Sequence, residues 1–161
     1  MRALIFFVAL SITSLFFTNS PQRAKTDIQP TRLFDEYRLI RWEDEKARLD
    51  NFAVALTNEP DSIGYIFVYD GMDICAGEAE ARALRAKRYI VEHRGVPWDR
   101  VIWRRDGYNG QFEIILEPIR RDVAVPYPFR RLAVDGHLVE THLNKNCATR
   151  MAAIKKSTFK N

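Results

Sequence analysis

The sequence is poor in the residues that mark specialised classes of protein. It holds two cysteines, seven glycines, seven prolines and three histidines in 161 residues. Two cysteines exclude a disulfide-dense small scaffold, and so few glycines and prolines exclude a collagenous or low-complexity chain. The chain also lacks a strong excess of either charge, because it has 25 basic and 21 acidic side chains and a net charge of only +4. Such a mild excess does not argue for nucleic acid as a partner.

The remaining composition is that of a folded domain. Hydrophobic residues make up 47% of the chain, aromatic residues 12% and charged residues 29%. A chain of this length holds one domain with appendages and is too short for two full-sized domains. We therefore expect a single core, flanked by segments with other roles.

An uncharged apolar run opens the chain. Residues 3–17 follow a positively charged start and contain no charged side chain. The run is shorter than the roughly 20 apolar residues that cross a bilayer, but it matches the central region of a secretory signal. We expect export to the periplasm or cell envelope, with 1–20 as the signal peptide and 21–30 as a spacer. Pro21 disfavours cleavage at that point, so an uncleaved membrane anchor stays open as an alternative.

The hydrophobic pattern of residues 31–117 predicts strands that alternate with helices. Leu49, Phe52 and Leu56 lie on one face at helical spacing, whereas Phe112 and its neighbours alternate as in a strand. The expected elements are a strand in 31–39, a helix from 43 to about 58, a strand at 63–69, a helix at 76–94, and strands at 101–103 and 111–117.

A stripe of alanines marks the second expected helix. Ala79, Ala83 and Ala86 recur at steps of four and three residues, so this helix is expected to lie close against its neighbour. The β-branched and aromatic run at 63–69 favours a buried central strand. Together the elements predict an α+β fold of order β-α-β-α-β-β, a two-layer sandwich in which two helices pack on one mixed sheet.

The composition changes after Pro118. Residues 118–161 carry nine basic and three acidic side chains, against sixteen and eighteen in the preceding part of the chain. This basic C-terminal extension predicts a small hairpin at 132–139 and a short basic helix at 147–156. We expect it to cover an edge of the sheet, or to contact anionic polymers or lipid headgroups through its lysines.

Several local motifs follow one another along residues 31–117. In order, they are Leu33-Phe34-Asp35, Lys46-Ala47-Arg48-Leu49, Arg85-Ala86, Tyr89-Ile90, Gly95-Val96, Arg100-Val101 and Gly107-Tyr108. These motifs resemble the OmpA-like domain of bacterial envelope proteins. The segments at 45–53 and 77–89 are more closely similar to uncharacterised exported proteins of the same superfamily.

This resemblance implies non-covalent binding of peptidoglycan. In the family, an Asp after the second strand and an Arg on the second helix hold the charged ends of diaminopimelate. A zwitterion of this kind needs a carboxylate for its ammonium group and a guanidinium for its own carboxylate. Arg85 matches the Arg of the family, and both Asp70 and Asp73 are candidates for the Asp. The sequence departs from the family at Ala81, Arg82, Gly71 and Met72.

The two cysteines have alternative uses. Because the expected compartment is oxidising, Cys75 and Cys147 are candidates for a disulfide. Alternatively, Cys75 is a nucleophile at a helix start, with a base among the three histidines, His93, His137 and His142. The histidine spacing does not fit a zinc site.

The preferred hypothesis is an exported, non-enzymatic envelope protein that binds peptidoglycan, with no cofactor, metal or nucleic acid. The alternative is an exported scaffold that uses the same fold to contact an envelope protein. A thiol enzyme that uses Cys75 is the most remote of the three.

Overall fold

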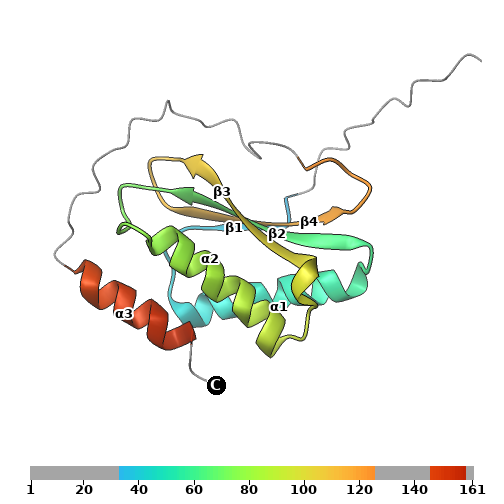
Figure 1. The fold of residues 1–161 in the computed structure, drawn as a ribbon, viewed down its shortest axis with the longest axis horizontal. Helices are drawn as coiled ribbons and strands as arrows, with labels where there is room; N and C mark the ends of the chain where they lie inside the picture. Colours follow the sequence, from blue (N-terminus) through green and yellow to red (C-terminus); the bar gives the residue numbers. More distant parts are fainter. Residues whose placement is uncertain (1–32, 126–145, 159–161) are drawn as a thin grey trace, which may run out of the picture.

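The structure is a computed structural model that describes residues 33–125 and 146–158. The expected signal peptide and spacer, the hairpin at 132–139, and the histidines His137 and His142 lie outside the described residues. The elements in chain order (Figure 1) are β1 (Asp35–Tyr37), α1 (Trp42–Asn58), β2 (Ser62–Asp70), α2 (Glu78–Arg88), a π-helical turn η1 (Tyr89–His93), a 3-10 turn η2 (Trp98–Arg100), β3 (Val101–Tyr108), β4 (Glu113–Arg120) and α3 (Cys147–Thr158).

The four strands form one mixed sheet in the order β1-β4-β2-β3. Strands β2 and β3 are parallel, and β4 is antiparallel to both β1 and β2. The chain can return to a parallel neighbour only through a crossover, which α2 provides. The expected α+β class and the alternation of strands and helices up to β4 are therefore confirmed, and α3 is a third helix.

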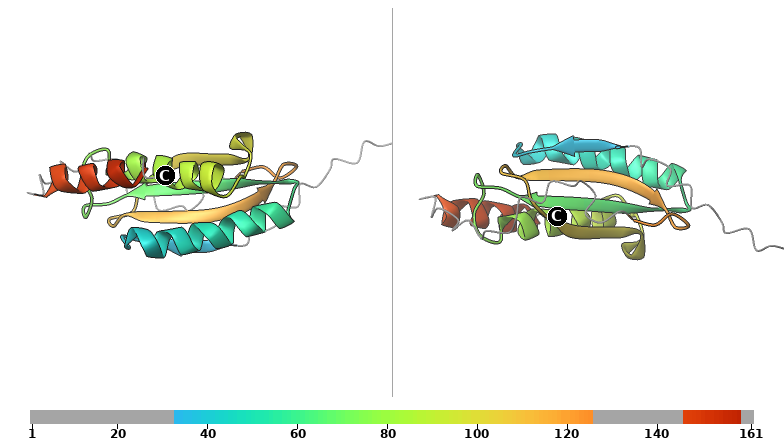
Figure 2. Two further views of the ribbon diagram at one scale, coloured as in Figure 1. Left: turned by 90° about the horizontal axis from the view of Figure 1, so that it is seen from below. Right: turned by 90° about the horizontal axis from the view of Figure 1, so that it is seen from above.

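Both α1 and α2 pack on the same face of the sheet (Figure 2). The side chains of β2 alternate, so that Ile66 and Val68 face the two helices while Phe67 and Tyr69 lie in a second cluster on the opposite face. The expected stripe of small side chains on α2 is buried in this core. The stripe consists of Ala79, Ala83 and Ala86. Among the described residues, no helix is long and apolar enough to cross a bilayer.

Two elements differ in length from the expectation. Strand β3 runs on to Tyr108. Asp106 is a bulge in β3 opposite Val68 and Tyr69 of β2, and the pairing continues beyond it. Helix α2 stops at Arg88 and gives way to the π-helical turn, so the expected single helix over 76–94 is two elements.

Strand β4 also runs through Pro118, which the sequence pattern treats as a boundary. Asp35 at the start of β1 pairs with Leu116, so β1 does not reach Pro118. One side of β4 is therefore an edge at this point, the setting in which a strand tolerates proline. The folded unit extends past residue 117 to at least the end of β4 at Arg120.

Candidate functional site

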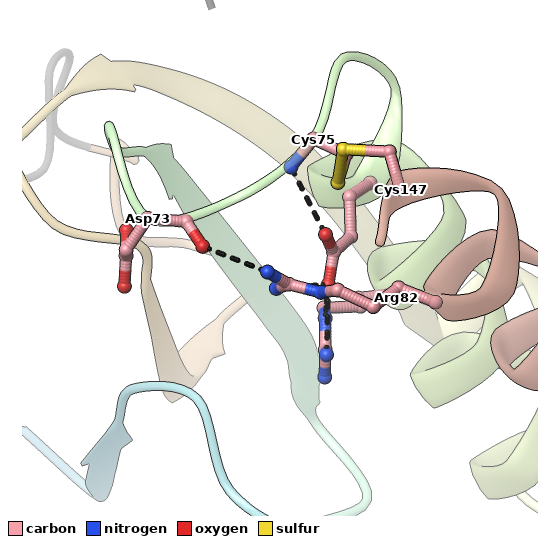
Figure 3. Close-up of a disulfide and its surroundings, with 6 residues drawn as sticks. Asp73, Cys75, Arg82 and Cys147 are labelled. Carbon is pink, nitrogen blue, oxygen red and sulfur yellow. Dashed lines mark hydrogen bonds and ion pairs between the residues drawn. A yellow bond between two sulfur atoms is a disulfide. The ribbon is translucent and has the colours of Figure 1, made fainter. Parts of the chain in front are cut away.

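A disulfide attaches α3 to the loop before α2. Cys75 and Cys147 are bonded, with their Cα atoms 5.6 Å apart (Figure 3). The pairing that the sequence offered as one alternative is present in the structure. In this state Cys75 carries no thiol that can act as a nucleophile.

Two polar contacts join α2 and α3 beyond the disulfide. Arg150 donates to Glu78 at 2.8 Å, and Arg85 donates to the Oγ atom of Ser157 at 3.1 Å. Both pairs, like the two cysteines, are separated by 72 residues. A constant separation means that the two helices run parallel in one register. Ile154, between the two polar contacts, is buried.

Glu78 is the polar centre of this helix pair. Its fully buried carboxylate accepts hydrogen bonds from the Cys75 N–H at 3.0 Å, from Arg82 Nε at 2.9 Å and from Arg150 (Figure 3). Burial alone would raise the pKa of Glu78, but these donors outweigh it and hold the pKa below its usual range. The carboxylate therefore stays ionised between the two guanidinium groups.

Arg85 forms a buried ion pair with Glu45 of α1. The two side chains are 5% and 1% exposed. The guanidinium lies over the ring of Trp42, 4.1 Å from its centre, and the hydroxyl of Tyr37 donates to Glu45 at 3.3 Å. Burial raises the pKa of Glu45, against the attraction of Arg85. The sequence treats Arg85 as a ligand residue on an open helix face, whereas the structure encloses it between α1, α2 and α3.

A cavity of about 230 Å³ lies between α2, α3 and the start of α1. Three guanidinium groups line it, those of Arg82, Arg85 and Arg150, together with Trp42 and apolar side chains. The Nε atom of Arg85 is buried and has no hydrogen-bond acceptor in the part of the chain that the structure describes. Because buried donors are rarely left unpaired, this wall fits an anionic group, and a carboxylate is the planar anion that guanidinium groups pair with best.

The two candidate aspartates have different partners. Asp70 forms an ion pair with Arg105 of β3. Asp73 accepts the N–H of Phe112 on Oδ1 at 2.6 Å, and its carbonyl accepts a hydrogen bond from Arg150 at 3.0 Å (Figure 3). Neither carboxylate contacts the Arg85 guanidinium. Asp73 is nevertheless joined through Arg150 to the wall of the cavity, whereas the ion pair of Asp70 is with the neighbouring strand.

The loop that carries Asp73 is tightly packed. A Cβ atom at Gly71 would collide with backbone atoms of Gln111 and Phe112 and with the Asp73 carboxylate. Glycine therefore lets the end of β2 approach the start of β4, which fixes Asp73 at this rim.

Sequence reasoning missed Arg150 and Glu45 as members of this cluster. The signal that could have found Arg150 is the cysteine pair: with Cys75 joined to Cys147, a parallel helix places residue 150 beside residue 78. No comparable signal exists for Glu45, which looks like one of several acidic residues at a helix start. In the described ranges 33–125 and 146–158, no group of three His, Cys, Asp or Glu side chains could hold a metal ion.

A scan against protein-family models finds no match to this chain, and searches of curated proteins and of solved structures find none either.

Proposed function

We propose that this chain is an exported, non-enzymatic protein of the cell envelope that binds peptidoglycan non-covalently through an OmpA-like domain. The observation that carries the proposal is the cavity lined by Arg82, Arg85 and Arg150, beside which the buried Nε of Arg85 has no acceptor among the described residues. Peptidoglycan stem peptides offer free carboxylates of the kind that such a wall pairs with. The order of elements and the motifs of residues 31–117 support the family resemblance.

The charge balance around the cavity supports an anionic ligand. Its three guanidinium groups are matched by two carboxylates, those of Glu45 and Glu78. Among the described residues, one of the three positive charges is left without a carboxylate partner. A ligand carboxylate would neutralise that charge.

Asp73 is the better of the two candidates for holding a ligand ammonium group. Only its Oδ1 atom accepts a hydrogen bond from a described residue, so Oδ2 remains available, and its backbone carbonyl binds Arg150, which lines the cavity. Asp70 is already neutralised by Arg105. The proposed site therefore combines Asp73 with the arginines and leaves Asp70 outside it.

One observation favours the second candidate, an exported scaffold that contacts an envelope protein. Arg85 is 5% exposed, and Ser157 of α3 contacts it on the side away from α1. A long polymer reaches such a group less easily than a single protruding side chain does. A protein partner with a protruding acidic side chain would satisfy the same cavity.

Retention on purified peptidoglycan sacculi tests the proposal. In Asp73→Asn the amide oxygen still accepts the Phe112 N–H, so the loop keeps its structure while the charge is lost. We expect retention to fall about tenfold, as for the loss of one charge-assisted contact. Asp122→Asn, at an exposed ion pair with Arg120, is the matched control and should retain the wild-type level.

Two outcomes would count against wall binding. One is equal retention of the Asp73 and Asp122 variants. The other is wild-type retention no better than that of an unrelated basic protein of similar charge, which would favour the scaffold.

A further inference from the structure

A second, larger cavity also borders Trp42. It is open to solvent, has a volume of about 750 Å³, and is formed by the start of α1, the π-helical turn and α3. Volumes of this order are typical of sites for small ligands. The cavity shares Trp42, Ala153 and Ser157 with the arginine cavity but contains none of the three arginines.

Three aromatic rings form a continuous wall of this cavity. Trp42 contacts Tyr89 edge-on, with ring centres 5.4 Å apart and planes at 81°. Tyr89 in turn contacts His93 at 5.2 Å, with the planes inclined by 32°. The π-helical turn holds Tyr89 and His93 together, and such turns are frequent at functional sites.

The charged side chains around the rings have a positive surplus. Lys46, Arg94 and Lys156 line the cavity, against the single carboxylate of Glu43. Glu43 pairs with Lys46 at 2.5 Å, and Arg94 pairs with Asp50. In the described part of the chain, Lys156 has no ion-pair partner. The cavity therefore offers a free ammonium group beside the aromatic wall.

We propose that this cavity binds an acidic sugar, a pyranose ring that carries a carboxylate. The C–H face of a pyranose packs on aromatic rings, and its hydroxyl groups need both donors and acceptors. The Lys46–Glu43 pair supplies both kinds of group. The carboxylate of the sugar would meet Lys156.

The inclination of the rings favours a sugar over a flat aromatic anion. A nucleobase is held best between rings that are close to parallel, with their faces open. The planes of Trp42 and Tyr89 are nearly perpendicular, and Arg85 already covers a face of Trp42. A non-planar pyranose fits an angled wall of this kind. This inference goes beyond the proposed function and does not depend on the site at Asp73.

Calorimetric titration of the full-length chain tests the proposal. The probe is a disaccharide that contains one uronic acid, and the comparison is the same disaccharide with its carboxylate reduced to an alcohol. We expect the acidic sugar to bind at least about tenfold more tightly than the neutral one. Lys156→Gln should weaken the acidic sugar about tenfold and leave the neutral sugar unchanged. Lys155→Gln, at the exposed neighbouring residue outside the cavity, is the matched control and should behave as wild type.

His93→Ala separates stacking from charge, because the exposed imidazole is removed without touching the core. This variant should weaken both sugars equally, and sodium acetate should bind to no variant. The proposal is overturned if the acidic and neutral sugars bind alike, if the two lysine variants behave alike, or if adenosine monophosphate binds more tightly than the acidic sugar. Asp73→Asn should leave sugar binding unchanged, so failure at one site is distinguishable from failure at the other.

Discussion

Loss of the Cys75–Cys147 disulfide is expected to release α3 from α2. The bond joins residues 72 apart in the sequence. In the chain-entropy model, a closed loop of that length is worth about 4 kcal/mol at 25 °C. This figure is an upper limit on the stability that reduction removes. The contacts of Arg150 and Ser157 with α2 are too few to keep a helix of 12 residues docked without the bond.

The assay is amide hydrogen exchange on the oxidised protein, the reduced protein and Cys147→Ser. The sheet and α1 form the core without help from α3, so their protection should change little. Protection of α3 should fall to near that of a free helix, because an isolated helix of 12 residues is marginal in water. The start of α2 should exchange faster as well, since Arg150 would no longer donate to Glu78.

A matched variant separates the tether from the contacts. In Arg150→Gln the disulfide remains, and only the guanidinium contacts to Glu78 and to the Asp73 carbonyl are lost. This variant should keep α3 protected, with a smaller loss at the start of α2. The reasoning is refuted if α3 keeps its protection after reduction, or if the midpoint of denaturation is the same in the oxidised and reduced proteins.

Two further predictions concern buried carboxyl groups. Arg85→Met leaves Glu45 as a buried charge without its partner and should lower the free energy of unfolding by about 3 to 5 kcal/mol. The double variant Arg85→Met with Glu45→Leu should recover most of this loss. If urea denaturation places the Arg85→Met variant within about 1 kcal/mol of wild type, the prediction is contradicted. Glu117 is buried beside the chain at Phe34, and burial raises its pKa to about 7, against the hydrogen bond from the Phe34 N–H. Because the folded form holds the proton more tightly than the unfolded chain, this group stabilises the fold at low pH, and the contribution is lost as the pH rises from about 4.5 through about 7. Glu117→Gln keeps an acceptor for Phe34 and should flatten the change in urea midpoint between pH 5 and pH 8; an unchanged slope would exclude Glu117 as the cause.

The layered core could be predicted from the sequence because periodicity alone determines it. The stripe of Ala79, Ala83 and Ala86 and the alternation through Ile114 and Leu116 both face the same core. Whether each of these side chains faces the core is indicated by the apolar residues three or four places away in a helix and two places away in a strand. This spacing is local, so it can be read without knowing how the rest of the chain folds.

The polar site could not be predicted in the same way. Arg85 and Glu45 are 40 residues apart, and their pairing depends on how α1 and α2 lie on the sheet. In the sequence, a buried arginine on a helix looks the same as its more exposed neighbour Arg88. The cysteine pair is the exception, because compartment and number alone made it a candidate.

The common separation of 72 residues means that α3 can make all of its contacts with α2 in one register only. A slip of α3 by a single residue would rotate it by about 100° and move it by about 1.5 Å, so Arg150 and Ser157 would miss their partners together. A shifted position of α3 therefore keeps none of these polar contacts, and the helix is either fully docked on α2 or undocked. Insertions or deletions inside 147–157 should prevent α3 from docking on α2, because they change the spacing between its contact residues. Only the spacing within the helix is constrained in this way.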